Sequence, residues 1–334
     1  MSETVRSNDL PRVWVLADDR PGNRSQCLGV ARVLGLPFEC KEIAYGPLVR
    51  LHNAFLGASF AAITDESLRA LTPPWPDLVI GAGRRSASVA RKIKRLSGGR
   101  TRLVHIMHPG AGAADFDLIA QPAHDARPPA PNILSIPAAP HGVTTEILGE
   151  AAEEWKDAFA HLPRPLIALM VGGSTRRREF GPAMAAEVAS LAAAMAKARG
   201  GSLLVSTSRR VEESEDPATM PALLDAFADL PNYLYRWGDP AGNPYMGYLA
   251  HADTVVVTGD SVSMSTEACA RPGPVYLYAP APLITPKHKR FHDFLFQGGY
   301  ARPLTSETVW EDWTHPPLNP AEDVARAIRE MMRL

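Results

Sequence analysis

The residues best placed to do chemistry follow an apolar run that ends at Thr258. They are Asp260, Ser261, Ser263 and Glu267. If a helix begins here, its first turn presents free backbone N–H groups, which form a natural anion site. Ser263 and Glu267 then share one helix face, where the carboxylate could accept hydrogen bonds from the hydroxyls of a ribose. The alternative is an ordinary helix start with a surface glutamate.

Two further groups of small, hydroxyl and basic residues follow other apolar runs. Glycines allow a backbone to approach a phosphate closely, and arginines supply fixed positive charge. Each group could instead be a turn with a solvated basic face, and this alternative is stronger for the group at 208–210. The candidate nucleotide- and phosphate-binding residues are Gly172, Gly173, Ser174, Thr175, Arg176, Ser208, Arg209, Asp260, Ser261, Ser263 and Glu267.

Two adjacent carboxylates, Asp18 and Asp19, end the first apolar run of the chain. Repulsion between them could raise the pKa of one and suit it to accept a proton, although the segment is equally good turn chemistry. His108 is a second candidate base, with a structural, hydrogen-bonded histidine as the alternative. The residues predicted to serve an acceptor are Arg20, Asn23, Arg84 and Arg85.

The apolar runs that must position these residues alternate with helical patterns. Strands are expected at 12–17, 38–43, 77–80, 101–107, 116–120, 132–136, 166–171, 202–206, 233–235, 253–258 and 275–278. Helices are expected at 26–34, 45–60 (irregular), 88–96, 144–162, 217–227, 244–250, after Ser174, after Asp260 and from Asn319-Pro320 onward. A glycine loop is expected at 81–86.

This alternation predicts an α/β protein with two doubly wound, Rossmann-like domains that face each other across a cleft. The expected boundaries are 1–140 for an acceptor-side domain and 141–318 for a donor-side domain. A C-terminal helix at 319–334 is expected, with packing against the first domain as one option. In such sheets ligands bind beyond the carboxyl ends of the strands, where all the candidate loops lie.

Composition narrows the classes of function. A net charge of −1, from 35 basic and 36 acidic residues, argues against a nucleic-acid partner and against broad attraction to an anionic membrane. The three cysteines, Cys27, Cys40 and Cys269, fit neither a disulfide framework nor a metal site, so no metal and no cofactor are predicted. No signal peptide and no membrane span are evident, which predicts a cytoplasmic protein, with peripheral contact at the inner membrane face left open.

Several motifs together resemble the family named for mitochondrial fission in plants, the elongated-mitochondria family, and its bacterial relatives. They are DDRPGNRSQ at 18–26, GAGRRSA at 81–87, HPG at 108–110, FDLIAQPAHD at 116–125, GGST at 172–175, NPYMGYLAHAD ending at Asp253 and TGDSVSMSTEA at 258–268. The resemblance covers nearly the whole chain. It implies a cellular role and says little about the chemistry of the protein.

At a greater distance the second half resembles the donor domain of GT-B glycosyltransferases. The resemblance implies that Gly173 and Ser174 contact a donor diphosphate, and that Ser261, Ser263 and Glu267 hold phosphate and ribose. The chain departs from those enzymes at 18–23, where they carry a glycine-rich loop with a histidine base.

The leading hypothesis is therefore a metal-independent glycosyltransferase of GT-B type that uses a nucleoside-diphosphate sugar. Its acceptor is left open, with a lipid-linked or envelope acceptor as one option. Two alternatives stay open: a nucleotide-sugar epimerase of the same fold, and a non-catalytic adaptor related to the mitochondrial fission proteins.

Overall fold

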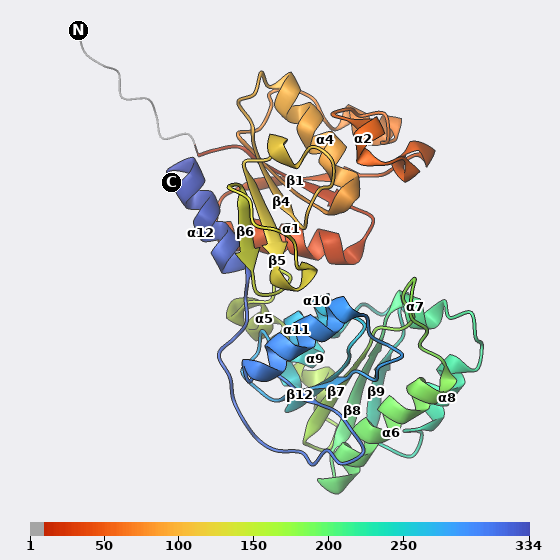
Figure 1. The fold of residues 1–334 in the computed structure, drawn as a ribbon. Coiled ribbons are helices and arrows are strands. Elements are labelled where there is room, and N and C mark those ends of the chain that lie inside the picture. The colour runs from red at the N-terminus through yellow and green to blue at the C-terminus, as the bar shows by residue number, and fades with distance from the viewer. Residues whose placement is uncertain (1–9) are drawn as a thin grey trace. The chain divides into compact units, whose positions relative to one another are not determined.

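The structure is a computed structural model that describes residues 10–334, and the chain in it forms two compact units (Figure 1). Unit 1 runs up to Gly142 and includes Pro320–Leu334, and unit 2 is Val143–Asn319. Within residues 10–334, no helix combines the length and the apolar character needed to cross a membrane. The two units are described separately below.

Unit 1 is built on a parallel six-stranded sheet of order β2-β1-β3-β4-β5-β6. Its strands are β1 (Val13–Asp18), β2 (Phe38–Ile43), β3 (Leu78–Ala82), β4 (Arg102–Ile106), β5 (Leu118–Pro122) and β6 (Ile133–Ile136). Its helices are α1 (Pro21–Leu34), α2 (Asn53–Leu56), α3 (Asp65–Arg69), α4 (Gly83–Leu96) and α12 (Ala321–Met332), with short 3₁₀ turns η1 (Pro47–Arg50), η2 (Ala113–Asp115) and η3 (Ala123–Asp125).

Alternation along β1 divides the core of unit 1 into two layers. Val13 and Val15 pack in the layer that also contains residues of α1 and α12, whereas Trp14 and Leu16 pack in the layer that contains Ile93 of α4. The C-terminal helix α12 therefore completes the core of the N-terminal unit, and Figure 1 shows it, in dark blue, beside β6.

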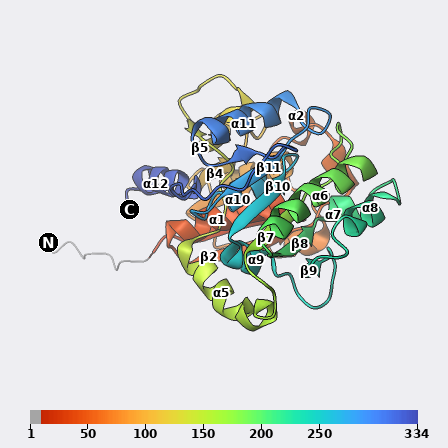
Figure 2. The ribbon, with the colours of Figure 1, turned by 90° about the horizontal axis from the view of Figure 1, so that it is seen from below.

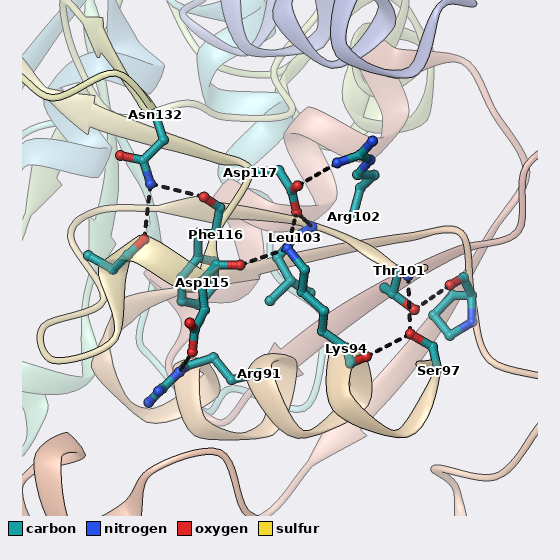
Figure 3. Close-up of polar contacts among 12 residues, drawn as sticks. Arg91, Lys94, Ser97, Thr101, Arg102, Leu103, Asp115, Phe116, Asp117 and Asn132 are labelled. Atoms are coloured by element: carbon teal, nitrogen blue, oxygen red, sulfur yellow. Dashed lines mark hydrogen bonds and ion pairs between the residues drawn. The ribbon is translucent and has the colours of Figure 1, made fainter. Parts of the chain in front are cut away.

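A network of charged groups holds the far end of α4 to this sheet (Figure 3). Asp117, the residue before β5, accepts hydrogen bonds from Lys94 (2.7 Å), Arg102 (2.8 Å) and the backbone N–H of Leu103 (2.8 Å). Burial alone would raise the pKa of Asp117, but these donors hold it below its usual value. Arg91 binds Asp115 in the same way, at 2.6 Å. Two of the six basic side chains of α4, Arg91 and Lys94, are thus paired with carboxylates in the second half of the helix.

Unit 2 repeats the architecture with a parallel sheet of order β12-β11-β10-β7-β8-β9. Its strands are β7 (Leu166–Val171), β8 (Ser202–Thr207), β9 (Asn232–Tyr235), β10 (Thr254–Thr258), β11 (Val275–Tyr278) and β12 (Arg302–Pro303). Its helices are α5 (Thr145–Phe159), α6 (Pro182–Ala198), α7 (Arg209–Glu212), α8 (Thr219–Asp225), α9 (Tyr245–His251), α10 (Val262–Ala268) and α11 (Pro286–Gln297). In Figure 2, α6 and α8 lie side by side, and both contribute to the main apolar core of the unit.

Strand order fixes where each unit can bind a ligand. Counted within its own unit, unit 2 has the Rossmann order 3-2-1-4-5-6, which reverses between β7 and β10. Unit 1 has the order 2-1-3-4-5-6, which reverses between β1 and β3. Such reversal points open a crevice at the carboxyl ends of the strands.

The predicted α/β class is confirmed, and each predicted strand overlaps an observed one, but several details are wrong. The expected glycine loop at 81–86 does not exist, because β3 passes directly into α4 at Gly83, whose positive φ of 70° makes the turn. Helix α1 begins at Pro21 instead of Gln26. The region 45–60 holds only two short helical turns, and Pro320 occupies the cap position expected for Asn319. Elements α3, α7, α11 and β12 were not predicted.

Candidate functional site

The glycine loop after β7 lies against the loop after β10, at the reversal point of unit 2. The N–H of Gly172 donates to Oγ1 of Thr258 at 2.7 Å, which ties the two strand ends together. A Cβ at position 172 would collide with the carboxylate of Asp260, so only glycine fits there. Gly173 has a φ of 101°, and a Cβ on it would meet the backbone N of Val211 at 2.8 Å. Both glycines are required by close packing.

Arg210, at the start of α7, is fixed in this loop by three groups. Its guanidinium pairs with Asp260 at 2.7 Å and donates to the carbonyl oxygens of Gly173 (2.8 Å) and Ser174 (3.2 Å). Asp260 is only 4% exposed, and burial raises the pKa of its carboxyl while Arg210 acts in the opposite direction. Asp260 therefore positions Arg210, and the half-buried Arg210 is the group that can meet a ligand.

A pocket of about 630 Å³ adjoins Arg210. One wall is the tight hairpin in which the N–H of Thr175 donates to the carbonyl of Arg178 at 2.7 Å and Oγ of Ser174 accepts from the N–H of Phe180 at 2.9 Å. The lining contains both arginines and carboxylates. The lining residues are Ser174, Thr175, Arg176, Arg177, Arg178, Glu179, Arg210, Glu213, Ser214, Glu215 and Asp216.

The neighbouring candidates Ser208 and Arg209 have different surroundings from Arg210. Oγ of Ser208 donates to the carbonyl of Gly172 and accepts from the N–H of Arg210 at 3.2 Å, so this serine caps α7 and braces the glycine loop. Arg209 pairs with Glu213 at 2.7 Å on the surface and does not line the pocket. The structure thus brings Arg210 to the loop and turns Arg209 outward.

The serine and glutamate group surrounds α10. Ser261 caps this helix by accepting from the N–H of Met264 at 3.4 Å, and Ser263 lies half-buried in the first turn. Glu267 is buried and accepts from the hydroxyl of Tyr245 on α9 at 2.8 Å. Burial, and then the charge of Glu267, raise the pKa of Tyr245 well above 10, so this hydroxyl keeps its proton. From the sequence alone, Tyr245 is interpreted only as part of the start of a helix.

His292 on α11 is a residue that the sequence interpretation missed. It is buried, and neither ring nitrogen has a hydrogen-bond partner among the residues that the structure describes. Its ring packs against Gly259, where a Cβ would lie 2.6 Å from Cε1. Burial lowers the pKa of His292 to about 4, so the ring is neutral at pH 7. The signal for α11 was present in the Thr285-Pro286 cap and in the spacing of Phe291 and Leu295.

In unit 1, Asp18 and Asp19 lie at the reversal point with Arg85 between them. Asp18 is buried and accepts from Nδ2 of Asn23 (2.9 Å), the N–H of Arg20 (3.1 Å) and Arg85 (3.3 Å). The Asp19 side chain is 66% exposed and also pairs with Arg85. The repulsion expected between the two carboxylates is therefore offset by a shared cation. Asp18 serves the fold here, and Asp19 is the carboxylate open to solvent.

Arg84 and Arg85 are adjacent but hold different parts of unit 1. Arg84 donates to the carbonyls of Val49 (2.7 Å) and Leu51 (2.6 Å), so it supports the segment after β2. Gly83 just before it packs against Asn23, and a Cβ on this glycine would lie 2.6 Å from Nδ2 of Asn23. Among the four predicted acceptor-side residues, Arg20, Asn23 and Arg85 meet at Asp18, and Arg84 does not.

His108 is half-buried at the turn after β4. Its Nδ1 accepts from the N–H of Gly110 at 3.1 Å, which leaves the proton of the neutral ring on Nε2. Burial and then Arg127 lower the pKa of His108 below 6.5. The ring is neutral at pH 7, but the nitrogen that could accept a proton already serves the turn.

Comparison with solved structures identifies the architecture. The chain superimposes on the UDP-GlcNAc 2-epimerase of Methanocaldococcus jannaschii, solved in complex with UDP-GlcNAc and UDP, with a TM-score of 0.54 and 11% identity over 97% of this chain and 100% of that one. It also matches a UDP-glucosyltransferase from Polygonum tinctorium, with a TM-score of 0.51 and 11% identity over 97% and 90% of the two chains. At such low identity these matches show the fold alone, which is the GT-B fold.

Comparison with sequences identifies the family. The chain is 31% identical to the mitochondrial fission protein ELM1 of Arabidopsis thaliana over 279 residues, which is 76% of this chain, and it spans 63% of that relative's length. It is 28% identical to a protein of Rickettsia prowazekii over 96% of this chain and 99% of that one. The model of the family described as "Mitochondrial fission ELM1" matches residues 21–332. The chain therefore belongs to the mitochondrial fission ELM1 family.

Proposed function

We propose that unit 2 binds a nucleoside-diphosphate sugar and that the protein transfers the sugar to an acceptor hydroxyl without an obligatory metal. In this proposal the acceptor oxygen attacks the anomeric carbon, the bond to the diphosphate breaks, and the nucleoside diphosphate leaves with the bonding electron pair. The acceptor proton passes to a base of the protein. The negative charge that develops on the leaving diphosphate must be balanced by fixed donors.

The observation that carries the proposal is the fixed position of Arg210. Its guanidinium is held by Asp260 and two loop carbonyls at the reversal point of the sheet, and it lines a pocket beside Ser174. A cation held in place before the ligand arrives loses little side-chain freedom on binding, which favours a charged group such as a diphosphate.

Two further features support binding of a nucleoside at the same edge. Ser263 lies in the first turn of α10, and Glu267 lies one turn later on the same helix. The Tyr245 hydroxyl donates to the Glu267 carboxylate and restricts its orientation. We assign phosphate contact to Ser261 and Ser263 and contact with the ribose hydroxyls to Glu267.

Asp19 of unit 1 is the base that we favour for the acceptor. Its carboxylate is exposed. Asp18, by contrast, is buried and accepts hydrogen bonds from three donors, and Nδ1 of His108 already accepts from the N–H of Gly110. Arg85, which binds Asp19, would hold the carboxylate in one orientation during proton transfer.

The first experiment is a calorimetric titration of the full chain with UDP, GDP and their sugars. We expect one nucleotide to bind, and we expect Arg210→Gln to weaken it by at least about tenfold, the loss typical of a charged hydrogen bond. Arg209→Gln is the matched control, because the neighbouring arginine is exposed and is not among the residues that line the pocket. Absence of binding by every nucleotide, or equal losses in the two variants, contradicts the proposal.

A nucleotide-sugar epimerase is the second candidate, favoured by the TM-score of 0.54 to the epimerase. The two reactions differ in what they need. An epimerase converts the nucleotide sugar with no acceptor, whereas a transferase releases the nucleoside diphosphate only when an acceptor or water takes the sugar. Product analysis by NMR, with the nucleotide sugar that binds and no added acceptor, separates them.

A further inference from the structure

The first turn of α11 brings a further basic side chain, His288, to the ligand edge of unit 2. Strands β10 and β11 are parallel, so the helix that follows β11 begins at the carboxyl ends of the strands. The loops that hold Arg210 and Asp260 lie at the same ends. His288 is half-buried there, and the proposed function as stated above gives it no role.

The capping box of α11 fixes the place of the proton on the His288 ring. Nδ1 of His288 accepts from the N–H of Thr285 at 3.3 Å, so the proton of the neutral ring is on Nε2. Within residues 10–334, Nε2 makes no hydrogen bond. His288 therefore offers an N–H donor that the fold itself does not use.

A second imidazole ring holds His288 against the loop after β10. The rings of His288 and His292 are stacked, with their centroids 6.4 Å apart and their planes inclined by 24°. His292 is only 2% exposed, and neither of its ring nitrogens has a partner in the described part of the chain. Its ring packs against Gly259, the residue before Asp260. The start of α11 thus lies beside the loop whose carboxylate pairs with Arg210.

The charged groups that act on His288 are positive. Burial lowers the pKa of His288 below 6.5, and the charges of Lys287 and Arg210 act in the same direction. Arg210 is therefore within electrostatic reach of the ring. Among the residues that the structure describes, no carboxylate pairs with His288, and Asp260 already serves Arg210. An anion bound between α7 and α11 would meet a donor on each side.

We propose that His288 gives unit 2 its preference for nucleoside diphosphates over nucleoside monophosphates, by donating from Nε2 to the phosphate farther from the ribose. This assignment rests on the proposed function, which places the ribose at Glu267 and phosphate at Ser261 and Ser263 of α10. Helix α11 follows the next strand of the sheet. The distal phosphate, which carries the developing charge when the sugar leaves, is then held by Arg210 on one side and His288 on the other.

Binding of the distal phosphate should also change the protonation of His288. A phosphate beside the ring favours its charged form and opposes the effect of Lys287 and Arg210, so the pKa of His288 rises and a proton is taken up. The wild type should therefore retain diphosphate affinity better than a variant without an imidazole as the pH falls from about 7.5 to about 5.5. The comparison between variants removes the effect of protonation of the phosphate itself.

The test is calorimetric titration of the full chain with UDP, UMP, GDP and GMP. His288→Ala should weaken the diphosphate at least about tenfold, the loss typical of a hydrogen bond to a charged group, and leave the monophosphate within about twofold. Thr285→Ala is the matched control, because it breaks the same capping box but keeps the imidazole, and both affinities should stay unchanged. His161→Ala, which removes an exposed histidine just before β7 at the opposite end of the sheet, should also bind as the wild type does.

His288→Gln separates the hydrogen bond from the stability of the helix. Glutamine at this position maintains a capping box and carries an amide N–H, so the variant should fold and should bind the diphosphate more tightly than His288→Ala. Glutamine takes up no proton. Its diphosphate affinity should therefore fall below that of the wild type most strongly at pH 5.5.

The outcomes distinguish His288 from the proposed function as a whole. Equal losses of diphosphate and monophosphate affinity in His288→Ala, or the same loss in Thr285→Ala, overturn the role of His288 and leave the proposed function standing. If the wild type binds no nucleotide, the proposed function fails, and inorganic pyrophosphate tests His288 by itself. Pyrophosphate should raise the pKa of His288, measured by NMR of its Cε1 proton, and an unchanged pKa overturns the assignment.

Discussion

Each unit has an aspartate–arginine pair at the point where its strand order reverses, but the two pairs are built differently. In unit 1, Arg85 is shared by two carboxylates, Asp18 and Asp19, which leaves surplus negative charge. In unit 2, the buried Asp260 pairs with Arg210, whose guanidinium lines the pocket. The same topology therefore offers a carboxylate at one edge and a guanidinium at the other. Local side chains decide the chemistry that each edge can serve.

The glycines beside these pairs differ as well. Gly173 of unit 2 meets the backbone of Arg210 and Val211, which has little freedom to move, whereas Gly83 of unit 1 meets the side-chain amide of Asn23. At the edge of unit 2, two backbone segments are therefore in direct contact. The edge of unit 1 is shaped by a side chain that can rotate.

Asp19→Asn should have the largest effect, because it removes the proposed base of unit 1 and leaves the pocket of unit 2 intact. We expect transfer to fall by about a thousandfold, which corresponds to about 4 kcal/mol of activation free energy. The measurement is the rate of nucleoside diphosphate release, with the nucleotide titration as control. If Asp19→Asn lowers the nucleotide affinity and leaves the transfer rate unchanged, the assignment of the base to unit 1 and of nucleotide binding to unit 2 is contradicted.

Acidification should destabilise both units through one buried histidine each. The pKa of His105 in unit 1 and that of His292 in unit 2 are both lowered to about 4 by burial. A histidine in the unfolded chain has a pKa near 6.5, so between about pH 6.5 and pH 4 the unfolded state binds a proton that the buried, neutral ring does not. The free energy of unfolding is therefore unaffected above about pH 6.5 and falls by about 3 kcal/mol for each histidine as the pH falls toward 4.

His292→Leu separates the two contributions to acid sensitivity. The variant should reduce by about half the loss of unfolding free energy that these histidines cause between pH 6.5 and 4.5, because His105 still titrates. Chemical denaturation across this pH range measures it. An unchanged pH dependence would show that His292 is not buried in its neutral form.

Gly173→Ala should destabilise unit 2 more than Gly238→Ala does. Both glycines have positive φ, 101° and 91°, so both substitutions strain the backbone, but nothing lies within 4 Å of a Cβ at 238. The difference isolates the collision with Arg210 and Val211, for which we expect about 2 kcal/mol. Equal unfolding free energies for the two variants would show that the loop can open without cost.

Two helix caps should give the smallest effects. Thr285 caps α11 in a reciprocal pair with His288, in which its hydroxyl accepts at 3.4 Å and its N–H donates to Nδ1 at 3.3 Å. Thr64 caps the five-residue α3 of unit 1 by accepting from the N–H of Ser67 at 3.4 Å, but its own N–H donates to the carbonyl of Ala44 outside the helix. Thr285→Ala should lower the unfolding free energy by about 1 kcal/mol and Thr64→Ala by about 0.5 kcal/mol. Urea denaturation measures both values, and the opposite order would contradict the assigned role of the capping box.

Much of the fold could be predicted because a buried parallel strand is a continuous apolar run. Strands such as β7, β8 and β10 are buried along their whole length and were located to within a residue at either end. Helix α11 was missed because its sequence, PKHKRFHDFLFQ, carries many polar residues and only a narrow apolar side. Strand β12 has two residues and no pattern of its own.

The sequence alone determined the fold class, the family motifs and the loops at the carboxyl ends of the strands, because apolar period and glycine position are local properties. It could not choose between Arg209 and Arg210 or between Asp18 and Asp19, since adjacent residues of one type look identical in a sequence. The tertiary structure made the choice by burying Asp18 under Asn23 and by pairing Arg210 with Asp260, 50 positions away. A charge acquires its role from partners that only folding brings within reach.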